Sequence, residues 1–255
     1  MTLAIHEWGE PGAPRVVCLH GVTSHARHFE RLATRLAPRF HVLAPDLLGH
    51  GDSRREPPWS NEAHVEAIVE TLGQEPATWI GHSYGARLEL ELAVHEPECV
   101  ERIVFLEPAV FLPPAVALFA AENARKERAY TSFVEGIDKR YEESALQSAA
   151  RHVLETELAT HLVLSDDGLW RYRYSQSAVV AAYGEMAREP PSFHRARVPT
   201  LIVQGSSSYL SYDHLLDAHR NALGDLLRVV TVDGGHTLLW DALDETAAAI
   251  EAFLV

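Results

Sequence analysis

Cysteine is scarce in this sequence: the 255 residues include only Cys18 and Cys99. Two widely spaced cysteines make neither a disulfide framework nor a set of zinc ligands. The histidines and carboxylates also lack metal-ligand spacing, because runs such as HEPE and HEW are too sparse. The chain contains neither the motif GxGxxG nor a P-loop, which bind nucleotide phosphates. We therefore expect no metal and no cofactor, and the apolar run VVCLH predicts that Cys18 lies in the core.

Basic residues are few relative to acidic ones: 22 Lys and Arg stand against 36 Asp and Glu, which gives a net charge of −14. This balance argues against a nucleic-acid backbone or an anionic membrane as partner, because both are negatively charged. The longest apolar run, 109–121, is shorter than the ~20 residues of a membrane span and contains two prolines. The first residues, MTLAIHEWGEPG, lack the basic and apolar regions of a signal peptide. We expect a cytoplasmic monomer or homodimer that acts on a small molecule.

What the sequence does contain is a regular alternation of two patterns. Short apolar runs of strand type recur along the chain, and stretches with helical periodicity, such as 29–36 and 65–72, lie between most of them. Strands that alternate with helices are typical of a parallel sheet covered by helices on both faces. The 47% of hydrophobic residues are sufficient for a large core. The expected strands are 3–8, 16–19, 41–44, 78–80, 103–106, 201–203 and 229–232.

The alternation stops between Leu106 and Thr200, where apolar residues keep a helical periodicity but no strands alternate with the helices. We interpret residues 109–196 as a helical cap inserted into an α/β core formed by 1–108 and 197–255. Open α/β sheets bind ligands at the carboxyl ends of their strands, so an insertion there would cover the site. The helices expected within the cap are 118–130, 142–164 and 177–188.

The strongest local motif is GHSYG at residues 81–85, which follows the run ATWI and precedes the helical stretch ARLELELAV. At a strand-to-helix junction this pattern makes a sharp turn that lifts the serine hydroxyl clear of the sheet. The glycines are needed because side chains at their positions would collide with neighbouring backbone. The flanking strand and helix favour this interpretation over a glycine-rich turn with an incidental serine.

Three further motifs occur in a fixed order around GHSYG. HGV (20–22) ends an earlier strand, PDLLGHGDS (45–53) follows the next one, and GGH (234–236) follows the last. With these motifs the chain resembles the α/β-hydrolase superfamily over nearly its whole length. The resemblance implies an α/β-hydrolase fold with a mostly parallel central sheet. PDLLGHGDS is interpreted as a structural turn, because its glycines suit a tight bend.

The resemblance implies roles for four residues of these motifs. Ser83 matches the nucleophile, and His236 matches the base that takes the serine proton and later returns it. The backbone amides of Val22 and Tyr84 match the two donors of the oxyanion hole. Among the 15 histidines, His236 is favoured because it follows the final strand behind a pair of glycines.

The acid that should orient His236 is missing from its usual place. In most relatives an Asp stands after the penultimate strand, whereas the stretch VQGSSSYLS has Ser208 at that position. Glu107, at the end of the preceding strand in RIVFLEPAV, is the favoured replacement, because some superfamily members place their acid there. Asp213, further along the loop, is the alternative, and a Ser–His dyad without an acid stays open.

Five residues near these motifs are candidates for the substrate pocket. His25 follows the oxyanion loop, Phe111 follows the expected acid and Trp240 follows the expected base. In the insertion, the aromatic stretch LWRYRYS contains Trp170 and Tyr174. These aromatic side chains can form a wall for an apolar or ring-bearing substrate, or they can pack the cap against the sheet.

We interpret the chain as a serine hydrolase that cleaves a carboxylic ester or lactone through an acyl-enzyme on Ser83. Related dehalogenases and epoxide hydrolases use an Asp where Ser83 stands, so the serine favours acyl transfer over alkyl displacement. Hydrolysis of a carbon–carbon bond or an amide on the same triad is the alternative. Two other classes stay open, namely a non-catalytic ligand-binding protein and a cofactor-free lyase.

Overall fold

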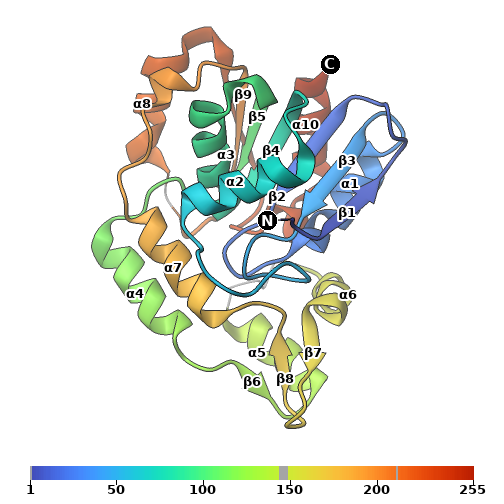
Figure 1. The fold of residues 1–255 in the computed structure, drawn as a ribbon. Coiled ribbons are helices and arrows are strands. Elements are labelled where there is room, and N and C mark those ends of the chain that lie inside the picture. Colours follow the sequence, from blue (N-terminus) through green and yellow to red (C-terminus); the bar gives the residue numbers. More distant parts are fainter. Residues whose placement is uncertain (1, 144–148, 211) are drawn as a thin grey trace.

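The structure, a computed structural model, describes residues 2–143, 149–210 and 212–255. Its main element is a seven-stranded sheet with the order β1-β3-β2-β4-β5-β9-β10 (Figure 1). β1 pairs antiparallel with β3, and the other neighbouring strands pair in parallel. Each of the seven expected strands is present, so the prediction of a mostly parallel sheet is confirmed. The strands are β1 (Ile5–Trp8), β2 (Arg15–Leu19), β3 (His41–Pro45), β4 (Ala77–His82), β5 (Val100–Leu106), β9 (Thr200–Gly205) and β10 (Leu227–Val232).

Hydrophobic clusters cover both faces of this sheet. In β5, Ile103 and Phe105 belong to the cluster on one face, whereas Val104 and Leu106 belong to the cluster on the other. This alternation follows from the two-residue period of a strand. Burial of each such side chain contributes about 1.5–3 kcal/mol. Cys18 is fully buried in the second cluster, as its apolar neighbours predict.

Helices supply the other half of each cluster. α2 (Asn61–Leu72), α3 (Tyr84–His95) and α8 (Asp213–Leu223) pack on the first face. α1 (Glu30–Leu36) and α10 (Leu243–Leu254) pack on the second. Within the described ranges, no helix combines the length and the apolarity that a membrane crossing requires. The other described core segments are the helix α9 (Leu238–Asp241) and the 3₁₀ turns η1 (Ala26–Phe29), η2 (Pro97–Cys99) and η5 (Gly224–Leu226), and η4 (Phe193–Arg195) lies at the end of the insertion.

The register of the central strands brings three chain segments to one edge of the sheet. His82 at the end of β4 pairs with Leu106 at the end of β5. Leu106 in turn pairs with Val203, near the end of β9. Because these strands run in parallel, the residues that follow them emerge side by side at the same edge. Ser83 and Glu107 are the first residues beyond β4 and β5.

The cap elements lie between β5 and β9 in the chain and together below the sheet in Figure 1. Besides its helices the cap contains a three-stranded antiparallel sheet of order β6-β8-β7, where the sequence pattern predicts only helix. The expected helices 118–130 and 142–164 both end in a strand, because their last residues pair across the cap with 170–172. Residues 144–148 of the second lie outside the described ranges. The cap elements are α4 (Pro114–Ala124), β6 (Ala129–Tyr130), α5 (Phe133–Glu143), α6 (Arg151–His161), β7 (Leu162–Leu164), β8 (Trp170–Tyr172) and α7 (Gln176–Met186).

Candidate active site

Ser83 lies in the sharp turn between β4 and α3. Its backbone has φ 55° and ψ −113°, a conformation that residues with side chains rarely adopt. A Cβ atom on Gly81 would come within 2.6 Å of the backbone nitrogen of Ala86. One on Gly85 would come within 2.0 Å of the carbonyl oxygen of Leu19. The turn therefore requires glycine at both positions, as the motif predicts.

Glu107 follows β5 directly and, like Ser83, has a positive φ. Within the described ranges these two are the only non-glycine residues with positive φ, and the value for Glu107 is 48°. Such conformations cost about 1–3 kcal/mol each, and they cluster at functional sites. The Glu107 amide donates to the carbonyl oxygen of Val203 at 2.9 Å, which fixes the strained residue against β9.

The carboxylate of Glu107 is buried, with 2% of the residue exposed, and it accepts three hydrogen bonds. Its Oε1 accepts from the amide of Gly205 at 2.6 Å. Its Oε2 accepts from the Ser208 hydroxyl and from Nδ1 of His236, the latter at 3.2 Å. A buried carboxylate requires such donors, because an unpaired one would be costly. Asp213, the alternative acid, is exposed in the first turn of α8.

The hydrogen bonds of His236 define its tautomer. A carboxylate only accepts, so Nδ1 carries the proton in the bond to Glu107. In the neutral ring this leaves Nε2 as an acceptor that can take a proton. The carbonyl oxygen of His236 accepts from Nε2 of His82 at 2.9 Å, which ties the loop after β10 to the residue beside Ser83. Burial lowers the pKa of His82 well below its usual value, and His236 and His28 lower it further.

The loop after β2 lies against the Ser83 turn. A Cβ atom on Gly21 would be 3.2 Å from Cβ of Ser83, so the backbone of this loop approaches the serine closely. His20 anchors the loop, because its Nε2 accepts from the amide of Leu47 at 3.0 Å. Val22 lines the same cavity as Ser83. The arrangement can present backbone amides to an oxygen bound beside Ser83.

A cavity of about 580 Å³ extends from Ser83 and His236 toward the cap. Of the five predicted pocket residues, Trp240 lines it, and the other four are not among its described lining residues. Several lining residues are ones that the sequence pattern does not single out. They are His28 and His82 from the core, Tyr209 from the loop after β9, and Arg128, Arg140, Glu157, His161 and Tyr183 from the cap.

The other four pocket candidates pack against aromatic side chains. His25 stacks on His161, with ring centroids 4.3 Å apart, so His161 faces the cavity in its place. Trp170 of the cap sheet packs on Phe133 of α5, at 5.5 Å between the ring centroids. His25 was expected at the cavity because it follows the oxyanion loop, and Trp170 was expected there because it belongs to the aromatic stretch of the insertion.

Tyr174 and Phe111 are displaced from the cavity in the same way. Tyr174 stacks on Tyr172, with ring centroids 5.3 Å apart, and is hydrogen-bonded to Arg128. Burial raises its pKa to about 12. Phe111 is half-buried beside His214, at 6.4 Å between the rings. Of the two possibilities left open for the aromatic stretch, a pocket wall or packing of the cap, its side chains follow the second in the cap's own hydrophobic cluster.

A buried polar contact joins the cap to the core at one wall of the cavity. Glu157 of α6 accepts from Nδ1 of His28 at 3.0 Å and from Nε1 of Trp240. Burial alone would raise the pKa of Glu157, but the charge of His28 and these hydrogen bonds lower it. Nearby, Nε2 of His161 donates to the carbonyl oxygen of Thr23 at 3.0 Å. Both contacts hold α6 over the loop after β2.

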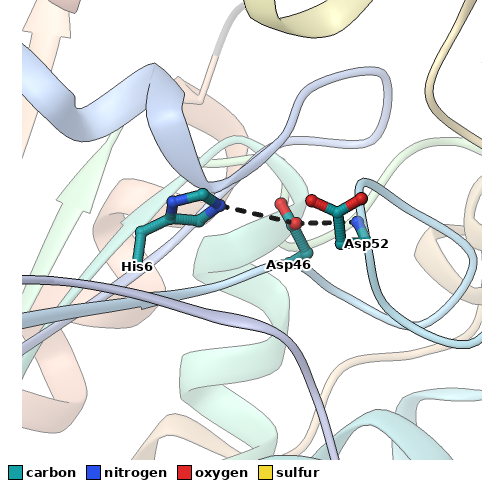
Figure 2. Close-up of side chains that lie close together, drawn as sticks. All are labelled: His6, Asp46 and Asp52. Atoms are coloured by element: carbon teal, nitrogen blue, oxygen red, sulfur yellow. Dashed lines mark hydrogen bonds and ion pairs between the residues drawn. The ribbon is translucent and has the colours of Figure 1, made fainter.

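One group of side chains has the composition of a metal site. Figure 2 shows His6, Asp46 and Asp52, whose ligand atoms all lie within 4.8 Å of one another. The Asp46 oxygens already accept from the amides of Ala26 and Asp52 at 2.8 and 2.9 Å. Asp52 is also paired with Arg173. These bonds fix the turn PDLLGHGDS, which agrees with its interpretation as structural.

Comparison with known proteins agrees with the fold. The model of the Alpha/beta hydrolase family matches residues 16–249, so the chain belongs to this family and the resemblance inferred from its motifs is confirmed. Lipase LipV from Mycobacterium tuberculosis is 34% identical over 259 residues, which cover 99% of this chain and 97% of that protein. A 3-hydroxybutyrate-oligomer hydrolase from Cupriavidus necator is 30% identical over 235 residues, covering 82% of this chain and 78% of that protein.

A solved structure gives the same result for the fold. The crystal structure of E-2-(acetamidomethylene)succinate hydrolase superposes with a TM-score of 0.85 at 25% identity, covering 99% of this chain and 94% of that chain. The family and the names of these relatives support hydrolase activity for this chain. The relatives differ in the compounds that their names specify, so they do not define a common substrate.

Proposed function

We propose that this chain is a serine hydrolase that cleaves a carboxylic ester or lactone through an acyl-enzyme on Ser83. The observation that carries the proposal is the hydrogen bond of 3.2 Å between Glu107 and Nδ1 of His236. It leaves Nε2 of His236 available as a base in the cavity that Ser83 also lines. Glu107 thus takes the role of the acid that Ser208 cannot supply.

The reaction follows from these positions. Nε2 of His236 takes the proton of the Ser83 hydroxyl while the serine oxygen attacks the substrate carbonyl. The carboxylate of Glu107 stabilises the imidazolium that forms, and the amides of Val22 and Tyr84 donate to the oxyanion. The intermediate collapses, the proton of His236 passes to the leaving alcohol oxygen, and an ester remains on Ser83. A water molecule, deprotonated by His236, then releases the acid and regenerates the serine.

Two features favour an ester or lactone over other acyl compounds. The cavity is lined by apolar side chains such as Leu112, Leu158 and Met186, which suits a substrate with a carbon chain or ring. Two of the relatives are named as a lipase and an oligomer hydrolase. An amide is the second candidate, because the structural relative is named for a compound with an acetamido group.

A fluorophosphonate probe tests the nucleophile directly. We expect covalent labelling of the wild type and its complete loss in Ser83→Ala, because the probe reacts with an activated serine. Exposed Ser206, on the loop after β9, gives the control: Ser206→Ala should label like the wild type. Absence of labelling in a folded wild type would favour a ligand-binding protein instead.

Kinetics with p-nitrophenyl esters separate the remaining alternatives. An acyl-enzyme mechanism predicts a burst of p-nitrophenol, equal to the enzyme concentration, whenever deacylation is the slow step. A lyase would release no acid product and show no burst. A panel of short esters, lactones, amides and vinylogous ketones then ranks the substrate classes by kcat/KM.

A further inference from the structure

Two arginine side chains of the cap line the same cavity as Ser83. Arg128 lies just before β6 and Arg140 lies on α5, so separate elements bring them together. Most of the neighbouring cap side chains in the lining are apolar, among them Leu112, Val116 and Leu158. The chain as a whole is acidic, with a net charge of −14. Two arginines in one cavity are therefore not the result of an excess of basic residues.

The acidic side chain of the cavity has hydrogen-bond partners of its own in the core. Among the described lining residues, Glu157 is the only carboxylate. Its oxygens accept from His28 and Trp240, both of which belong to the core. The cap side of the cavity therefore carries more positive than negative charge.

Arg140 has the more informative surroundings. Its guanidinium lies 5.8 Å from the ring centroid of Trp240, on the helix that follows His236. Among the described residues it forms no ion pair. A guanidinium at the wall of a largely apolar cavity is costly unless an anion pairs with it.

We propose that Arg128 and Arg140 form a subsite for a carboxylate group of the substrate. A guanidinium presents parallel N–H groups that match a carboxylate, and the pairing is strong where water is excluded. The substrate would then carry a free carboxylate remote from the carbonyl that Ser83 attacks. This inference rests on the proposed function and narrows it to acidic esters, lactones or amides.

Matched esters test the subsite. Monoethyl esters of succinic, glutaric, adipic and suberic acid carry the free carboxylate at increasing distance from the ester. Ethyl esters of the monocarboxylic acids with the same chain lengths are the neutral controls. We expect the wild type to favour one anionic ester over its neutral counterpart in kcat/KM, and the best chain length gives the reach from Ser83 to the arginines.

Variants of the two arginines test whether the subsite causes the preference for anionic esters. Arg140→Gln should lower kcat/KM for the best anionic ester by about 10- to 100-fold, the value of a hydrogen-bonded charge pair, and change the neutral ester less than about 3-fold. Arg128→Gln should act in the same direction. The control is Arg125→Gln, because Arg125 is an exposed cap arginine paired with Glu122 outside the cavity. Equal losses for both esters, or no loss for either, would overturn the subsite.

A binding measurement separates failure of the subsite from failure of the proposed function. Calorimetry of monoethyl adipate with Ser83→Ala and with Ser83→Ala/Arg140→Gln needs no turnover. Binding that is weakened by the second substitution supports the subsite even if the wild type neither hydrolyses esters nor labels with fluorophosphonate. Hydrolysis without any preference for anionic esters refutes the subsite and leaves the role of Ser83 intact.

Discussion

The sheet edge and the cap meet at one cavity, but they position their side chains in different ways. At the edge, Ser83 and Glu107 each follow a strand directly, and the register of β4 with β5 sets their spacing. In the cap, Arg140 and Glu157 lie on helices α5 and α6, where helix packing sets their positions. Backbone geometry thus fixes the groups that we propose to react, whereas an inserted segment supplies groups that can select the substrate.

The largest effect should come from the edge. Glu107→Gln keeps the size of the side chain but removes the charge that stabilises protonated His236, so we expect kcat to fall by about 10²- to 10⁴-fold. Asp213→Asn should keep near-normal turnover, because Asp213 is exposed on α8. Steady-state kinetics on the best ester of the panel measure both. A reversed result, with normal Glu107→Gln and inactive Asp213→Asn, would identify Asp213 as the acid.

The next prediction concerns how the cap is attached. Burial lowers the pKa of His161 to about 4, from an ordinary value near 6.5, while its Nε2 donates to the Thr23 carbonyl. Because the folded protein binds this proton less readily, stability is highest above about pH 6.5 and falls as the pH drops toward 4. Between pH 7 and 5, His161 should therefore contribute about 2 kcal/mol of destabilisation.

Urea unfolding of His161→Gln at pH 7 and pH 5 measures that contribution. The variant should lose about 2 kcal/mol less between the two pH values than the wild type does. His152→Gln is the matched control, because His152 is exposed on the same helix, and its loss should equal that of the wild type. Identical pH dependence in wild type and His161→Gln would show that this contact does not couple the cap to the core.

The two regions also differ in how far the sequence predicts them. The strands and the turn at Ser83 follow from local sequence patterns. The contacts that require the two glycines of GHSYG are both near and distant, since Gly81 faces Ala86 at the start of α3 and Gly85 faces Leu19 of β2. Glu107 could be proposed as the acid from the sequence because a lone carboxylate at the end of an apolar strand needs a partner. Ser208, which marks the missing acid, was not predicted to donate to Glu107.

The strands of the cap could not be predicted in this way, because each forms by pairing with a segment that lies elsewhere in the chain. β6, β7 and β8 are short strands that form only by pairing with one another, for example Tyr130 with Trp170. Aromatic residues of this stretch could face either the cavity or the cap cluster, and no local pattern decides between the two. Arg140 and Glu157 carry no motif, so only the folded structure reveals that they line the cavity.

The smallest effect should come from Ser208, a positioning residue at the edge. Ser208→Ala removes one of three donors to the Glu107 carboxylate but leaves Gly205 and His236 in place. We expect kcat to fall by about 3- to 10-fold, the value of one hydrogen bond. Ser206→Ala is the matched control, because its hydroxyl donates to exposed Asp233 outside the cavity, and its kcat should not change.

A double-mutant cycle decides whether Ser208 acts through Glu107. If it does, Ser208→Ala should have no further effect on kcat in the Glu107→Gln background, because the charge that it orients is already gone. If Ser208 only stabilises the loop after β9, the same 3- to 10-fold loss should recur in that background. Additive losses would therefore separate the serine from the acid, whereas non-additive losses would place both in one network at the sheet edge.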